Sequence, residues 1–183
     1  MKMYRFFLFV LIILFWSCSA QNVKKEKINT KANKAYNASV KSFSGKLEKG
    51  EFQEIRKKIE AELNTEVPED KSILINYRQN GKNCIGYEYT TESFERVVKN
   101  SQKISDRISK EHNIEDYFVY ASDALNKEKY EKKEEFILDS GFFQQQIFTL
   151  QENCEAFYIL KPNGEFLKSY GEDYYSRVEA FFE

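Results

Sequence analysis

An unbroken run of apolar residues lies close to the start of the chain, from Phe6 to Trp16. Lys2 and Arg5 precede this run, and small residues follow it, which is the pattern of a bacterial signal peptide. The run is shorter than the about 20 apolar residues that a membrane-spanning helix needs. We therefore predict that residues 1–20 form an export signal and that the rest of the chain works outside the cytoplasm.

Periodic patterns begin at Glu51 and predict alternating helices and strands. A stripe of apolar residues at helical spacing predicts a first helix, over Phe52, Ile55, Ile59 and Leu63. Asn64–Pro68 interrupts it, and residues 72–77 form a short apolar run typical of a buried strand. Residues 79–89 are expected to be a loop. A long helix follows, capped by Thr91 or Ser93, with the inner face Phe94, Val97, Val98, Ile104 and Ile108.

The second half of the chain continues this alternation. Asn113 interrupts the long helix, and residues 117–121 read as a second strand. Residues 124–136 are strongly charged and are expected to be helical, whereas residues 142–150 fit either a short helix or a strand. The end of the chain predicts a strand over residues 156–160, a turn with Pro-Asn-Gly over 161–164 and a return strand over 165–170. A last helix, capped by Asp173, is expected over residues 174–182.

Strands that alternate with helices, followed by a closing hairpin, predict an α/β fold with a mixed sheet. We expect one domain over residues 50–183. Residues 21–49 hold eight lysines and two glutamates and few large apolar residues, so we expect a lysine-rich tether. This tether is either a solvated linker or loose helix, or a segment attracted to anionic lipid headgroups.

Composition narrows the function classes. The 28 basic residues balance 29 acidic residues, which argues against a nucleic-acid-binding protein, as does export. Two cysteines, Cys84 and Cys154, remain after the signal, and an even number in an oxidising compartment is typical of a disulfide.

The residues Ser17-Cys18 after the apolar run resemble the lipobox of bacterial lipoproteins, in which the cysteine is lipidated. Phe15 and Trp16 depart from that pattern. We favour lipidation of Cys18, which implies a cell-envelope protein held on the membrane by its lipid, in the periplasm or on the outer membrane. The alternative is ordinary cleavage after Ala20, which implies a soluble secreted protein.

The element order and two sequence blocks resemble the thioredoxin-like fold, closest to extracytoplasmic thioredoxins of the TlpA type. Residues 73–77, Ile-Leu-Ile-Asn-Tyr, match the family strand that leads into its C-x-x-C motif, and Cys84 falls at the first motif cysteine. Residues 154–164 match the later family block without a gap. The motif is degenerate here, because Tyr87 replaces the second cysteine and Glu155 replaces the family's cis-proline. We expect a trans bond before Glu155.

The resemblance places Cys154 against Cys84 in space. Three interpretations follow: a structural disulfide, a redox pair of unusual arrangement, or two unpaired buried thiols. A catalytic Cys84 would need a thiolate, and Lys82 is close in sequence, but the expected helix starts several residues too late for its dipole to help.

Other candidate chemistry is weak. His112 is the only histidine and is expected at the surface or at a helix end. One histidine and two distant cysteines do not make a zinc site, and no cofactor motif is present, so we expect no metal and no cofactor. The alternating charges of residues 127–135 are typical of a solvated helix face.

Two functions remain. One is a non-catalytic thioredoxin-like module that binds an unknown protein partner or scaffolds an envelope assembly. The other is a thiol-disulfide oxidoreductase or peroxidase-like enzyme that uses Cys84 with Cys154 as resolving thiol. The missing second cysteine and the missing proline favour the first.

Overall fold

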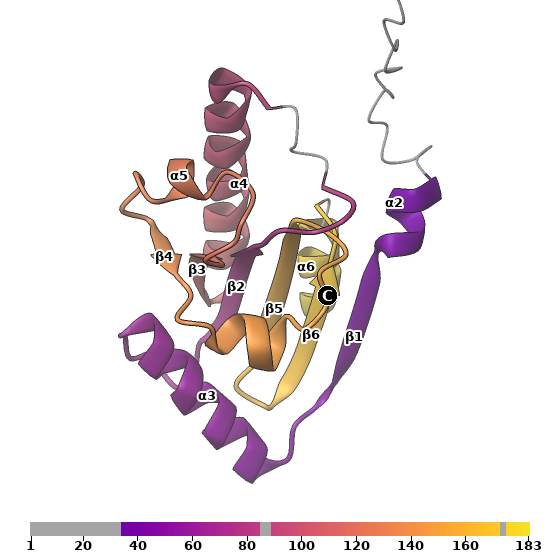
Figure 1. Ribbon diagram of the computed structural model, residues 1–183. Coiled ribbons are helices and arrows are strands. Elements are labelled where there is room, and N and C mark those ends of the chain that lie inside the picture. The colour runs from indigo at the N-terminus through magenta and orange to yellow at the C-terminus, as the bar shows by residue number, and fades with distance from the viewer. Residues whose placement is uncertain (1–33, 85–88, 173–174) are drawn as a thin grey trace, which may run out of the picture.

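A six-stranded mixed sheet forms the centre of the computed structural model, which describes residues 34–84, 89–172 and 175–183 (Figure 1). The helical elements are α2 (Lys34–Ser39), α3 (Lys49–Leu63), α4 (Thr91–His112), α5 (Lys127–Tyr130), the π-helical turn η2 (Phe143–Ile147) and α6 (Tyr175–Phe182). The strands are β1 (Lys41–Lys46), β2 (Ser72–Arg78), β3 (Ile114–Tyr120), β4 (Phe136–Leu138), β5 (Glu155–Leu160) and β6 (Glu165–Tyr170).

The strands lie in the order β1-β6-β5-β2-β3-β4. β2 and β3 are parallel and are joined through α4, whereas β5 is antiparallel to β2 and forms a hairpin with β6. The predicted α/β class, the mixed sheet with flanking helices, and the C-terminal hairpin followed by a helix are therefore confirmed. This architecture is compatible with a thioredoxin-like fold.

Alternate residues of β2 point to opposite faces of the sheet, and helices cover both faces (Figure 1). On one face, Leu74 packs in a cluster with Ile108 of α4 and Val178 of α6. On the other face, Tyr77 stacks on Phe148 directly after η2, with ring centroids 4.3 Å apart. All seven residues of β2 are buried, which agrees with the mostly apolar sequence of residues 73–77.

Local capping residues fix the two long helices. The N-cap of α4 is Thr90, whose hydroxyl accepts a hydrogen bond from the Ser93 amide at 3.2 Å, so the helix is capped one residue before the predicted Thr91. Asn64 ends α3 and Asn113 ends α4, both in the left-handed conformation that asparagine tolerates. The predicted breaks at these two asparagines are confirmed. The expected cap Asp173 lies outside the described residues.

The predicted helix over residues 124–136 is wrong over most of its length. Only Lys127–Tyr130 is helical, and Phe136 begins a short strand that pairs in parallel with β3. The reason is aromatic packing: the ring of Phe136 lies 4.7 Å from that of Tyr130 and 5.4 Å from that of Phe118. Burial of these rings outweighs the helical preference of the charged residues between them.

The ambiguous segment over residues 142–150 contains the π-helical turn η2. The buried carboxylate of Asp139 organises this turn. It accepts hydrogen bonds from the backbone amides of Gly141, Phe143 and Gln144 at 2.9–3.0 Å and from the Tyr77 hydroxyl at 2.8 Å. One acidic side chain thus satisfies three amides at the start of the turn and a buried phenol.

The segment expected to be a tether, residues 21–49, ends in ordered structure. Residues Lys34–Ser39 form α2, and Lys41–Lys46 form β1, which pairs antiparallel with β6 over six residues. All six residues of β1 are exposed, so its hydropathy resembles that of a linker. Backbone pairing with β6, rather than side-chain burial, makes this segment a strand, and the sheet begins before residue 50.

Within the described part of the chain, no helix is both long and apolar enough to cross a membrane.

Candidate functional site

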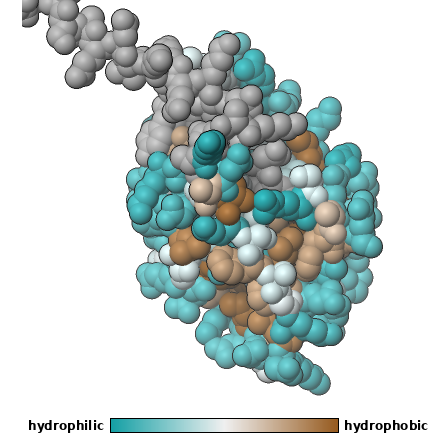
Figure 2. All heavy atoms as spheres, turned by 90° about the vertical axis from the view of Figure 1, so that its right-hand side faces the viewer, coloured by the Kyte–Doolittle hydropathy of each residue, from teal (hydrophilic) through white to brown (hydrophobic). Residues whose placement is uncertain are grey.

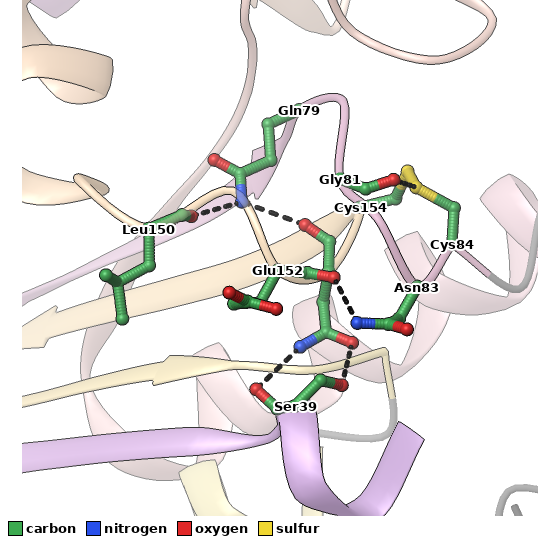
Figure 3. Close-up of a disulfide and its surroundings, with 9 residues drawn as sticks. Ser39, Gln79, Gly81, Asn83, Cys84, Leu150, Glu152 and Cys154 are labelled. Atoms are coloured by element: carbon green, nitrogen blue, oxygen red, sulfur yellow. Dashed lines mark hydrogen bonds between the residues drawn. A yellow bond between two sulfur atoms is a disulfide. The ribbon is translucent and has the colours of Figure 1, made fainter. Parts of the chain in front are cut away.

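A disulfide bond joins Cys84 to Cys154, with the two Cα atoms 4.9 Å apart (Figure 3). Cys84 lies in the loop after β2, and Cys154 lies directly before β5. The two strands are neighbours, and Arg78 at the end of β2 is the register partner of Glu155 at the start of β5. The predicted pairing of these cysteines is confirmed, and the interpretation as two unpaired thiols is excluded.

The two sulfur atoms differ in their surroundings. Cys154 is buried, with 7% of its surface exposed, whereas Cys84 is half-buried. The Cys84 sulfur lies 3.0 Å from the carbonyl oxygen of Gly81. The peptide bond between Cys154 and Glu155 is trans, as expected.

Backbone hydrogen bonds join the two loops that carry the cysteines. The amide of Gln79 donates to the Cys154 carbonyl at 2.9 Å, and the amide of Asn83 donates to the Glu152 carbonyl at 2.9 Å. A third bond runs between the two loops, from the Lys82 amide to the Gln151 carbonyl at 3.2 Å. The disulfide therefore closes a junction that the main chain already forms.

Buried amide side chains complete this junction and attach the N-terminal segment to it (Figure 3). The Gln79 amide nitrogen donates to the carbonyls of Leu150 and Asn153, both at 2.8 Å. The Asn153 side chain accepts a hydrogen bond from the Ser39 hydroxyl at 2.9 Å and donates to the Ser39 carbonyl at 3.1 Å. Three distant segments, around residues 39, 80 and 153, thus meet at the disulfide.

The close approach of these segments requires a glycine at position 81. A Cβ atom placed on Gly81 would lie 2.6–2.9 Å from the backbone carbon, oxygen and nitrogen of Asn153. Real Cβ atoms do not come so close to main-chain atoms, so one of the two loops would have to move.

We expect Gly81→Ala to lower the free energy of unfolding by about 1–3 kcal/mol, the usual cost of overpacking a closely packed site. Urea denaturation measures the change. Gly50→Ala is the matched control, because nothing lies within 4 Å of a Cβ at Gly50, which is exposed in the first turn of α3. The control should leave stability unchanged or raise it, and an equal response of the two variants would contradict the close packing at Gly81.

A buried ion pair lies beside the disulfide. The guanidinium of Arg78 is 3.0 Å from the Glu155 carboxylate, and their side chains are only 4% and 17% exposed. Burial raises the pKa of the Glu155 carboxyl, and the positive charge of Arg78 acts in the opposite direction. Glu155 therefore neutralises a buried cation.

Two hollows adjoin the junction. The inner one is a cavity of about 30 Å³, lined by the Arg78–Glu155 pair, Cys154 and side chains that include Tyr89, Phe94 and Tyr130. Its volume suits a single water molecule rather than an organic ligand. The outer one is an open polar hollow of about 290 Å³ between Gly81, Lys82, Asp123 and Gln151.

The other candidates from the sequence do not join this site. His112 occupies the last turn of α4 and stacks on Phe182 at 5.0 Å, whereas the loop that bears Cys84 leads into the first turn. Lys82 is exposed. Of the charged residues 127–135, Lys127 and Glu131 pair with each other at 3.2 Å on the surface, as expected of a solvated face. Cys18 and Tyr87 lie outside the described residues.

Sequence reasoning missed the polar residues that build the junction: Ser39, Arg78, Gln79 and Asn153. Arg78 and Gln79 directly follow an apolar strand, and Asn153 directly precedes the second cysteine. The position of Arg78, Gln79 and Asn153 next to the two sequence blocks associated with the cysteines was the signal that could have identified them. Among the described residues, no three His, Cys, Asp or Glu side chains come together as a metal site would require.

Fold and site together define an α/β protein with a mixed six-stranded sheet whose central strands are joined at one end by a disulfide-closed junction. Comparisons with protein-family models, with curated proteins and with solved structures gave no match.

Proposed function

We propose that this chain is an exported, thioredoxin-like module of the bacterial cell envelope, held on the membrane by a lipid on Cys18. In this proposal the module is non-catalytic, and it binds a protein partner or scaffolds an envelope assembly. The Cys84–Cys154 disulfide serves as a structural clamp at the end of the sheet where a TlpA-type protein would carry its dithiol.

The observation that carries this proposal is the junction around the disulfide. Three backbone hydrogen bonds, the buried amides of Gln79 and Asn153, and the packing of Gly81 against Asn153 hold the two loops together. A dithiol that exchanges with substrates needs at least one accessible sulfur and loops that tolerate both redox states. Here Cys154 is buried, Cys84 is only half-exposed, and three backbone hydrogen bonds join the loops in addition to the disulfide.

A thiol-disulfide oxidoreductase is the second candidate, and the half-buried Cys84 favours it. An attacking thiolate would reach this sulfur first and release Cys154 as the leaving thiol. In the reduced state, the Cys84 thiol could donate its proton in a hydrogen bond to the Gly81 carbonyl, 3.0 Å away. Such a bond would stabilise the thiol rather than the reactive thiolate, which weakens this candidate.

Turnover separates the two functions. We expect the full chain not to accelerate the reduction of insulin disulfides by dithiothreitol. The variant Cys154→Ala leaves Cys84 unpaired. When it is mixed with envelope proteins that have been reduced and then reoxidised, we expect it to trap no more mixed disulfide than the control Cys84→Ala/Cys154→Ala. Acceleration of insulin reduction, together with a mixed disulfide on Cys84, would contradict the non-catalytic module and support the oxidoreductase.

Lipidation is tested at Cys18. We expect Cys18→Ala to move the chain from the membrane fraction to the soluble fraction and to abolish incorporation of labelled palmitate, whereas Ser19→Ala changes neither. The physical reason is that two or more acyl chains give stable anchoring, which is lost when the lipidated cysteine is replaced. A mature wild-type chain that begins at Gln21 and carries no lipid would show ordinary cleavage instead.

A further inference from the structure

The strand β1 forms one edge of the sheet and faces the viewer in Figure 2. It lies at the end of the strand order, next to β6, and its six residues are all exposed. In the described part of the chain, no other strand pairs with its outer edge. Apolar side chains gather in the middle of this side of the molecule, and hydrophilic side chains surround them (Figure 2).

This edge is suited to accept a further strand. Its pairing with β6 continues without a bulge from Lys41 to Lys46, and it contains no proline. Proteins usually protect edges by proline, bulges, very short strands or charged side chains such as lysine, and β1 has only the last of these, at its two ends. The opposite edge is different, because β4 is only three residues long.

The side chains of β1 define what such a strand must carry. Phe43 is 46% exposed and shares its face of the sheet with Gly45, over which the ring of Phe166 lies. Lys41 and Lys46 flank these residues, and β1 contains no acidic residue. A complementary strand has apolar residues opposite positions 43 and 45 and acidic residues opposite the two lysines.

We propose that β1 is the binding edge of the module and that its ligand is an extended acidic segment of a partner protein, added to the sheet as a seventh strand. This inference rests on the proposed function as a binding module. A second copy of the chain fits less well, because full-length antiparallel pairing of two β1 strands would place Lys41 of one copy opposite Lys46 of the other. Main-chain hydrogen bonds supply affinity in this mode of recognition, and the alternate side chains supply specificity.

The probe is a capped peptide of sequence Glu-Val-Thr-Val-Thr-Glu, designed for antiparallel pairing with residues 46 to 41. The full chain is held in a neutral detergent, and amide hydrogen exchange is followed residue by residue. We expect the peptide to slow exchange in β1 and to leave α3 and α4 unchanged. The same peptide with lysine in place of both glutamates should bind about tenfold more weakly, since its charges repel the edge.

The matched variant is Lys41→Glu/Lys46→Glu, which changes only exposed positions. It should bind the basic peptide in preference to the acidic one, by about the same factor. No protection of β1, protection at another surface, an unchanged preference in the variant, or dimerisation through β1 without peptide would overturn this inference. If the peptide does not bind and the chain does not reduce insulin, only the β1 proposal is contradicted. If the chain accelerates insulin reduction, the non-catalytic function is contradicted, whatever β1 binds.

Discussion

Replacement of Cys84 and Cys154 together by alanine is expected to lower the free energy of unfolding by about 4 kcal/mol. The bond closes a chain segment with a sequence separation of 70, and removal of so long a constraint raises the conformational entropy of the unfolded chain. Urea denaturation of the oxidised wild type and the double variant measures the difference. The loss should appear with a larger dependence on urea, because the unlinked unfolded chain exposes more surface.

Reduction of the wild type is the control for this variant, because it removes the bond and keeps both side chains. We expect a similar loss of stability, while the folded double variant keeps the hydrogen bonds between Gln79 and the loop over residues 150–154. Slow amide exchange at Gln79 and Asn83 in the folded variant would show that the junction persists. A loss below about 1 kcal/mol in both experiments would contradict the interpretation of the bond as a structural clamp.

Replacement of Arg78 by methionine is expected to lower the free energy of unfolding at neutral pH by about 3–5 kcal/mol, the usual cost of breaking a buried ion pair from one side. The variant leaves the Glu155 carboxylate buried without the cation 3.0 Å away. Arg78→Met/Glu155→Gln should recover most of the loss, because no buried charge then remains uncompensated. Lys58→Met, which breaks the exposed pair with Glu54, should leave stability nearly unchanged.

The sign of the pH dependence follows from the pKa of Glu155. Burial raises the pKa of this carboxyl, and the loss of Arg78 removes the charge that lowers it. The folded variant therefore binds a proton more tightly than the unfolded chain, whose glutamate pKa is about 4.3. The cost of the buried charge is present in full above the folded pKa and is relieved as the pH falls through that value toward the unfolded pKa. The stability gap between Arg78→Met and wild type should narrow between pH 7 and pH 4, and a constant gap would contradict a buried carboxylate.

Strong local patterns explain why much of the fold could be predicted. The stripe from Phe52 to Leu63, the apolar run of β2 and the Pro-Asn-Gly turn each depend on residues close in sequence, and the structure contains the corresponding helix, strand and hairpin. The pairing of Cys84 with Cys154 came from a different source, the match of two sequence blocks to strands that are neighbours in the thioredoxin-like fold.

The parts that could not be predicted depend on contacts between distant residues. β1 is a strand because β6 offers it a backbone edge, and its exposed residues show no hydrophobic period. Phe136 begins a strand because its ring packs on Phe118 and Tyr130. Ser39 and Asn153 meet across 114 positions of the sequence, and neither residue type indicates its partner.

The equilibrium reduction potential of the Cys84–Cys154 disulfide tests the central claim most directly. The full chain is equilibrated with mixtures of reduced and oxidised glutathione, and the fraction of reduced Cys84 is measured by thiol alkylation. A structural clamp predicts a potential below about −300 mV, so that the bond resists reduction by glutathione. A potential near about −200 mV, the range of exchanging dithiols, would contradict the clamp and support an oxidoreductase.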